Sequence, residues 1–217
     1  MKYKPIYFYS EADKCYVAVC PELKGCMTDG ETIEEALSNL DEVSEEWLAV
    51  NRDLGEPDPI AISDMSDIRT NPSVKDVAKF ILTRTGIITT MALLKLVYYC
   101  QAWSYGWTGK PLCAAEFQAW KDGPVNPELF RINQGKRLAS LDSFPAPDHS
   151  FSPIETAIMD MVLDVYDEFT GEELSVMTHH DAPWNEGRNG LPDGAWCDNP
   201  ITPESLIKYY GKALSII

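Results

Sequence analysis

The chain has 217 residues, of which 45% are hydrophobic and 11% aromatic, as is typical of a soluble globular protein with one or two domains. Its 34 acidic residues outnumber 18 basic ones and give a formal net charge of −16 at pH 7. Nucleic acids and anionic membranes are bound through Lys and Arg, so this charge disfavours both as partners and favours a basic partner.

Targeting signals and cysteine pattern both favour a cytoplasmic protein. No apolar run approaches the roughly 20 residues that span a bilayer, and Met1 to Pro5 lacks the apolar core of a signal peptide. The six cysteines form no CxxC pair and have no histidine at zinc-finger spacing. Buried reduced thiols are therefore favoured over the alternative, a metal cluster of Cys15, Cys20 and Cys26.

Residues 1–63 are predicted to form a small α+β module. Two β-prone runs, 6–9 and 16–19, are joined by a polar segment and predict a hairpin. A third short strand is expected near 26–28, ending at the Asp-Gly pair that follows. Residues 60–62 are predicted to add an edge strand to the same sheet.

A helix is predicted after Thr32, because Thr32 and Glu35 have the spacing of a capping box. Its opposite face is acidic, with no Lys or Arg between residues 31 and 46. Such a run is usually a solvated face. Because no Lys or Arg lies at i,i+4 to pair with these carboxylates, the alternative is that a basic partner docks on this face through Glu34, Glu42 and Glu45. The inward face is predicted to hold Ile33, Ala36, Leu37, Leu40, Val43 and Trp47.

Residues 17–48, VAVCPELKGCMTDGETIEEALSNLDEVSEEWL, resemble the HicB antitoxin domain. The shared features are a strand, a proline turn, Gly-Cys, Gly-Glu-Thr and a helix beginning Glu-Glu-Ala. The resemblance implies a small sheet backed by a helix that covers a partner toxin, and a homo-oligomer through this module. HicB proteins usually add a DNA-binding tail, and this chain has a different domain in that place.

A proline-rich stretch separates this module from the rest of the chain. Pro57, Pro59 and Pro72 make it loop-like. We therefore predict a module over 1–63, a linker over 64–72 and a mainly α-helical domain over 73–217. The fold class is α+β, with a small antiparallel sheet plus helix followed by helices.

The C-terminal part contains several helix start and stop signals. Ser73 with Asp76 begins one helix, and Gly86 ends it. Another begins at Ser152, with proline and glutamate in its first turn, and is predicted to run to Gly171. Two further short helices are predicted, one over 127–133 and one that ends at 178–181. A loop is expected over 144–149, and a last helix is expected to begin after Thr202 and to include Leu214.

The stretch from Leu93 to Phe130 is the apolar centre of this domain. Its first part is apolar at nearly every position, which predicts a helix buried on all sides. Gly106 and Gly109 are predicted to break that helix, which would leave Trp107 exposed in a turn. An aromatic segment follows and is closed by the Asp-Gly-Pro sequence at 122–124.

Three blocks of this domain resemble the signatures of the Panacea family, also called SocA-like or phage-associated GepA-like. They are LLKLVYYCQAW (93–103), AEFQAWKDGPVNPELF (115–130) and LSVMTHHDAPW (174–184). Members are typically the antitoxin of a toxin–antitoxin pair, and the resemblance covers roughly residues 72 to 212. It places signature positions on Thr178, His179, Pro183 and Trp184, and we expect His179 and Trp184 near the 120–124 turn.

The two resemblances together imply an antitoxin that binds a cognate protein toxin, encoded by the adjacent gene. No catalytic, cofactor or metal residue is expected. The alternative is a metal-dependent hydrolase using His179, His180 and Asp181, although adjacent histidines on a regular helix cannot face one metal. An adaptor that delivers the toxin to a protease is a variant of the binding role. The predicted partner contacts are Trp107, Trp120, Lys121, Asp122, Gly123, Pro124, His179 and Trp184, with Glu34, Glu42 and Glu45 as an acidic flank.

Overall fold

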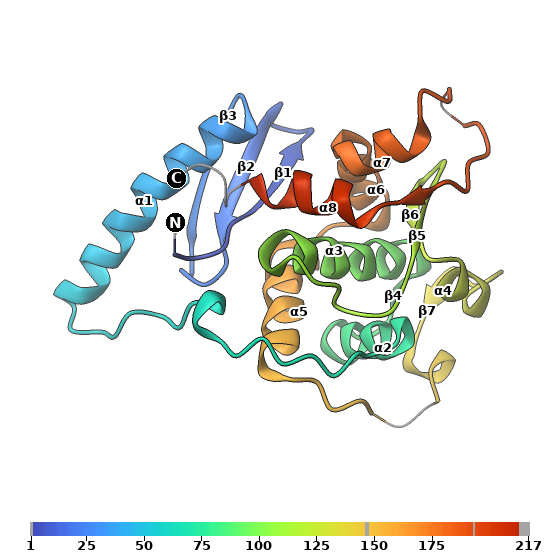
Figure 1. Cartoon of the computed structure of the whole chain (residues 1–217), viewed down its shortest axis with the longest axis horizontal. Coiled ribbons are helices and arrows are strands. Elements are labelled where there is room, and N and C mark those ends of the chain that lie inside the picture. Colours follow the sequence, from blue (N-terminus) through green and yellow to red (C-terminus); the bar gives the residue numbers. More distant parts are fainter. Residues whose placement is uncertain (1, 146–147, 193, 213–217) are drawn as a thin grey trace. The chain divides into compact units, whose positions relative to one another are not determined.

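The computed structural model describes residues 2–145, 148–192 and 194–212, and its contacts divide them into two compact units, 2–67 and 68–212 (Figure 1). The first holds a three-stranded antiparallel sheet and a helix, and the second is mostly helical, which confirms the α+β class. Predictions for Ala146, Pro147 and Leu214 lie outside the described residues. None of the described helices has the length and hydropathy of a membrane span.

The sheet of the first unit follows the sequence prediction closely. Strands β1 (Ile6–Ser10), β2 (Cys15–Cys20) and β3 (Cys26–Gly30) are antiparallel neighbours in chain order. The β1–β2 hairpin pairs Phe8 with Val17, and Lys14 takes a positive φ of 57° in its turn. The predicted edge strand at 60–62 is wrong: Ile62–Asp64 forms a 3-10 turn (η1), and the Ile62 N–H donates to Glu22 rather than to a strand.

Helix α1 (Ile33–Asp53) packs against β2 and β3 (Figure 1). Thr32 caps it by accepting from the Glu35 N–H, but the capping box is incomplete because the Glu35 carboxylate accepts from the Glu31 N–H instead. The buried face also differs from the prediction at its C-terminal half. The buried residues there are Ser44 and Leu48, each one position after a residue predicted to be buried. Those predicted residues, Val43 and Trp47, line an open groove instead.

Helix α3 (Thr90–Thr108) is the centre of the second unit, and α2, α5, α6 and α8 pack around it (Figure 1). The predicted break at Gly106 is wrong, because α3 continues to Thr108 and ends at Gly109 in a left-handed conformation. Gly106 instead allows close helix packing, since a Cβ there would lie 2.6 Å from the Tyr210 carbonyl oxygen. Trp107 is therefore helical and 6% exposed, with its ring against Trp103, and the predicted exposure is wrong.

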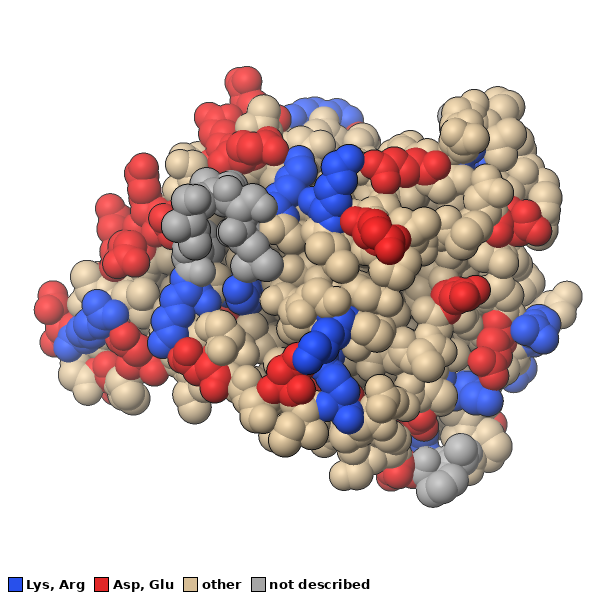
Figure 2. Space-filling view, in the orientation of Figure 1, with Lys and Arg blue, Asp and Glu red and all other residues tan. Residues whose placement is uncertain are grey.

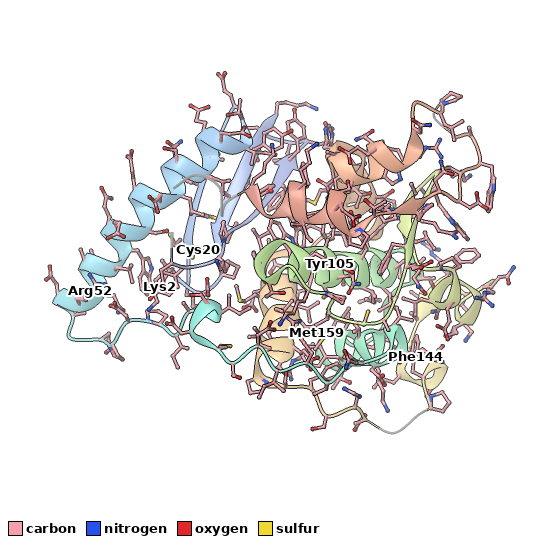
Figure 3. All side chains as sticks on the ribbon, viewed as in Figure 1. Lys2, Cys20, Arg52, Tyr105, Phe144 and Met159 are labelled. Carbon is pink, nitrogen blue, oxygen red and sulfur yellow. The ribbon has the colours of Figure 1, made fainter. Side chains whose placement is uncertain are left out.

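Helix ends around α3 depend on side-chain caps. Ser73 starts α2 (Val74–Thr85) and Ser152 starts α5 (Pro153–Tyr166), each through a complete capping box, as predicted. Gly171 does not end α5; it begins α6 (Gly171–His180), because Thr170 and Glu173 form another capping box. Figure 3 shows Met159 on α5 and Phe144 beside α2, both buried. The remaining helical elements are α4 (Pro127–Ile132), η2 (Leu141–Ser143), α7 (Ala182–Arg188) and α8 (Pro203–Tyr210).

Short strands, which the sequence did not reveal, connect these helices. β4 (Ile88–Thr89) pairs with β7 (Leu138–Ala139). β5 (Phe117–Trp120) lies between β6 (Gly123–Val125) and β8 (Pro200–Ile201), with β6 forming the other arm of a hairpin. The aromatic segment and the Asp-Gly-Pro sequence thus form a β-hairpin on the surface of the helical unit.

Candidate functional site

The β5–β6 hairpin is held tightly against α3 and α6. Gly123 begins β6 with a φ of +98°, and a Cβ there would lie 2.5 Å from Lys95 Nζ and 2.6 Å from Thr178 Oγ1. Ser175 Oγ donates to the Asp122 carbonyl at 2.7 Å. Only glycine fits both the backbone conformation and this space. The hairpin tip, Lys121 and Asp122, is thereby fixed in position while its side chains stay exposed.

Lys95 lies below this hairpin, on the otherwise apolar helix α3. The residue is 1% exposed, and its Nζ donates to the Pro124 carbonyl at 3.2 Å. Burial lowers the pKa of Lys95 to about 7, and the nearby Asp122 carboxylate partly opposes that shift. An ammonium group has three donors, and a buried one is stabilised by an anion or by several acceptors. Lys95 is thus a buried amine whose protonated form is incompletely compensated inside the domain.

A cavity of about 580 Å³ opens beside the hairpin and includes Lys95 in its wall. Trp120 lines it, edge-on to Phe130 at 4.9 Å and tilted against Trp196 at 5.4 Å between ring centroids. Trp196 is 70% exposed, which is unusual for so large an apolar ring. The cavity is lined by Thr89, Thr90, Met91, Leu94, Lys95, Trp120, Lys121, Asp122, Val125, Phe130, Lys136, Arg137, Glu172 and Trp196.

The support behind the hairpin comes from α6 and α7. The Trp184 indole N–H donates to the Trp120 carbonyl at 2.8 Å, and the His179 ring stacks on Trp184 at 4.1 Å. His179 and Trp184 thus lie next to the 120–124 turn, as the sequence indicated. Trp184, Gly123 and Pro124 are buried and shape the cavity from behind, whereas Trp120, Lys121 and Asp122 line it.

The residues of the hydrolase alternative lie in different surroundings, although His180 is close enough to Asp181 to act on its pKa. His179 stacks on Trp184, His180 is exposed, and Asp181 is buried. Asp181 accepts from Tyr210 Oη at 2.6 Å and from Tyr209 Oη at 3.1 Å, and burial raises its pKa to about 6. Across residues 2–145, 148–192 and 194–212, no three His, Cys, Asp or Glu side chains are grouped as metal ligands.

The cysteines of the alternative metal cluster do not form a group of three ligands among the described residues, although Cys20 and Cys26 are paired across β2 and β3. Cys20 and Cys26 are buried, and Cys15 is half-buried. Burial raises the pKa of Cys20 well above that of a free thiol. A raised pKa disfavours the thiolate that both metal binding and nucleophilic chemistry require.

The acidic face of α1 is the second candidate surface. Glu34, Glu42 and Glu45 are all exposed, as predicted. Figure 2 shows acidic side chains gathered along α1 at the left of the view. This face belongs to the first unit, whereas the cavity belongs to the second.

Of the cavity lining, sequence reasoning named Trp120, Lys121 and Asp122 as partner contacts and missed the rest, which include Lys95, Phe130, Lys136, Arg137 and Trp196. One signal was available, since Lys95 is the charged residue within an apolar helix that buries nearly its whole circumference. Trp196 lies two residues after Gly194 and is far from the hairpin in sequence, and nothing in its local pattern indicates that it packs on Trp120.

Comparison with known proteins assigns a family to each of the two units. Residues 4–59 match the family described as UPF0150-like, and residues 93–185 match the family described as Antitoxin SocA-like, Panacea domain. A UPF0150 protein of Synechocystis sp. is 39% identical over 67 residues, which cover 29% of this chain and 82% of that protein. No solved structure matches the chain.

The chain therefore belongs to the UPF0150-like family through its first unit and carries a SocA-like Panacea antitoxin domain in its second. UPF0150 domains are of the HicB-like antitoxin type, so both resemblances noted in the sequence are confirmed. The presence of two antitoxin-family domains supports an antitoxin role within a toxin–antitoxin system.

Proposed function

We propose that this protein neutralises a cognate protein toxin by direct protein–protein binding, and that the adjacent gene encodes the toxin. The observation that carries this proposal is the fusion of two antitoxin-family domains in one chain. The role is non-enzymatic, which is supported by the engagement of His179 in stacking on Trp184 and of Asp181 in a buried hydrogen bond from Tyr210.

The toxin contact in the second unit centres on the cavity beside the β5–β6 hairpin. Binding hot spots are enriched in Trp, Tyr and Arg and lie in pockets that exclude water. Trp120, Trp196 and Arg137 line this cavity, and Lys121 and Asp122 stand at its rim. Trp107 is not part of the contact, because it is a buried residue of α3.

The acidic face of α1 adds a second contact in the first unit. Glu34, Glu42 and Glu45 are exposed on a chain with a net charge of −16. Such a face attracts a basic surface over a distance and accelerates encounter more than it tightens the final complex. The first unit is also the site at which two copies of the chain would associate.

Co-expression with the neighbouring open reading frame tests this function. The product of that frame should arrest growth alone, and co-expression of the full-length protein should restore growth. The two purified proteins should form a complex that survives size-exclusion chromatography. If growth stays arrested when both proteins are present at equal levels, or if growth recovers without a complex, direct neutralisation is wrong.

We also propose that the two units fold independently, with the boundary within residues 64–72. The change from a sheet with one helix to a helical core across this stretch supports that boundary. Limited proteolysis should cut there and leave a C-terminal fragment with cooperative thermal unfolding. Loss of structure from both fragments after a single cut would contradict the proposal.

A further inference from the structure

The cavity beside the β5–β6 hairpin carries positive charge on a strongly acidic protein. Its lining includes four basic side chains, Lys95, Lys121, Lys136 and Arg137, against two acidic ones, Asp122 and Glu172. The chain as a whole has 34 acidic and 18 basic residues. The local charge balance is therefore opposite to that of the molecule, which points to an anionic ligand.

The cationic groups differ in how far they are already neutralised. Lys121 lies 3.9 Å from Asp122, and Lys136 Nζ donates to the neutral Ser143 hydroxyl at 2.9 Å. Lys95 is the buried member, and the acceptor it has among the described residues is a neutral carbonyl, that of Pro124. A buried ammonium with one neutral acceptor gains most from an added carboxylate, because the pair would be screened little by water.

The cavity also offers a surface for a flat apolar group. The rings of Trp120, Phe130 and Trp196 meet at 4.9 and 5.4 Å between centroids, and Trp196 remains 70% exposed. Aromatic side chains stack on such rings in offset or edge-on arrangements. A volume of about 580 Å³ lies within the range of small-ligand pockets, which suits a few side chains rather than a folded element.

We propose that this cavity binds a short segment of the partner protein in which an acidic side chain lies next to an aromatic one. The carboxylate pairs with Lys95 and Arg137, and the aromatic ring stacks on Trp120 and Trp196. This assignment rests on the proposed antitoxin function and adds the chemistry of the toxin segment. It complements the acidic α1 face, which selects for basic surface elsewhere on the partner.

A blocked acidic peptide and its neutral analogue provide the direct test. Titration of the full-length protein with Ac-Glu-Phe-Leu-NH2 should shift the indole N–H resonances of Trp120 and Trp196. The neutral peptide Ac-Gln-Phe-Leu-NH2 should bind at least about tenfold more weakly, because an ammonium hydrogen-bonds a neutral amide oxygen more weakly than a carboxylate. Equal binding of the two peptides, or absence of shifts at both tryptophans, would overturn the proposal.

Two variants with matched controls locate the charge recognition. Lys95→Met keeps an unbranched side chain one atom shorter and should weaken binding of the acidic peptide about 30-fold, as expected when one member of a buried charge pair is lost. Lys208→Met is its control, because Lys208 is 81% exposed on α8. If Lys95→Met does not fold, Arg137→Glu at an exposed position replaces it, with the exposed Arg131→Glu as control.

Growth assays separate failure of this inference from failure of the antitoxin function. If the wild type, Lys95→Met and Arg137→Glu all rescue growth equally well, the inference about the cavity is wrong and the antitoxin function is still supported. If the wild type does not rescue growth, the proposed antitoxin function itself is wrong. Adenosine monophosphate is included as a competing anion with a flat ring, and its binding in place of the acidic peptide would overturn the assignment to a protein segment.

Discussion

The two candidate surfaces of this protein use charge in opposite ways. The α1 face carries exposed carboxylates on a helix, where water and salt screen them. The cavity of the second unit places a fully buried Lys95 beside aromatic rings, where screening is weak. We therefore expect the α1 face to act mainly on the association rate of a partner, and the cavity to act mainly on its dissociation rate.

The largest expected effect separates core tryptophans from contact tryptophans. Trp107→Ala should lower the free energy of unfolding by about 3–5 kcal/mol, because the ring is buried against Trp103 and its loss leaves a cavity in α3 packing. Urea denaturation followed by circular dichroism measures this change. A Trp107→Ala protein with wild-type stability and weakened toxin binding would instead restore Trp107 as a contact residue.

Trp196→Ala should show the opposite pattern. The ring is 70% exposed, so unfolding should change little, while toxin affinity should fall by about 2 kcal/mol as for hot-spot truncations. Calorimetric titration with the toxin measures the affinity. Ile87→Ala is the control, because Ile87 is 67% exposed in the same unit and does not line the cavity. Equal effects of the two substitutions would contradict the contact assigned to Trp196.

The buried lysine predicts a distinct pH dependence of stability. The pKa of Lys95 is lowered to about 7 in the folded protein, so the unfolded chain binds more protons between about pH 7 and pH 10. Stability should therefore rise with pH over this window, by at most about 1.4 kcal/mol per pH unit. The Asp122 carboxylate raises the pKa of Lys95 and so opposes the effect of burial, which narrows the pH range over which stability rises. Thermal unfolding of wild type and Lys95→Met at several pH values should show that the variant lacks this rise in stability. If stability changes with pH in the same way in both proteins, the prediction is wrong.

Most of the fold could be predicted because local signals determine it. The β1–β2 hairpin and the caps at Ser73 and Ser152 depend on residues that are near each other in sequence. The errors share a different cause. Gly106 reads as a helix breaker locally, but α8 packs on it and keeps α3 helical, and the sequence gives no sign of that long-range contact.

The candidate site was predictable only in part for the same reason. The hairpin tip and Trp184 belong to recognisable motifs, and the structure brings them together through the Trp184 hydrogen bond to Trp120. Trp196 and Arg137 reach the cavity from loops that carry no motif. Their contribution follows from tertiary packing, which local patterns do not encode.

The smallest effect on the final affinity is expected at the acidic face of α1. Replacing Glu34, Glu42 and Glu45 together by Lys should slow toxin association roughly tenfold at low salt and change the dissociation rate little, because exposed charges act mainly on encounter. Stopped-flow kinetics at several salt concentrations measures both rates, and the salt dependence of association should decrease in the variant. Replacing the same residues by Gln controls for loss of charge without reversal and should give an intermediate rate. A larger effect on dissociation than on association would mean that α1 is a close contact surface, and the division of roles between the two units would then be wrong.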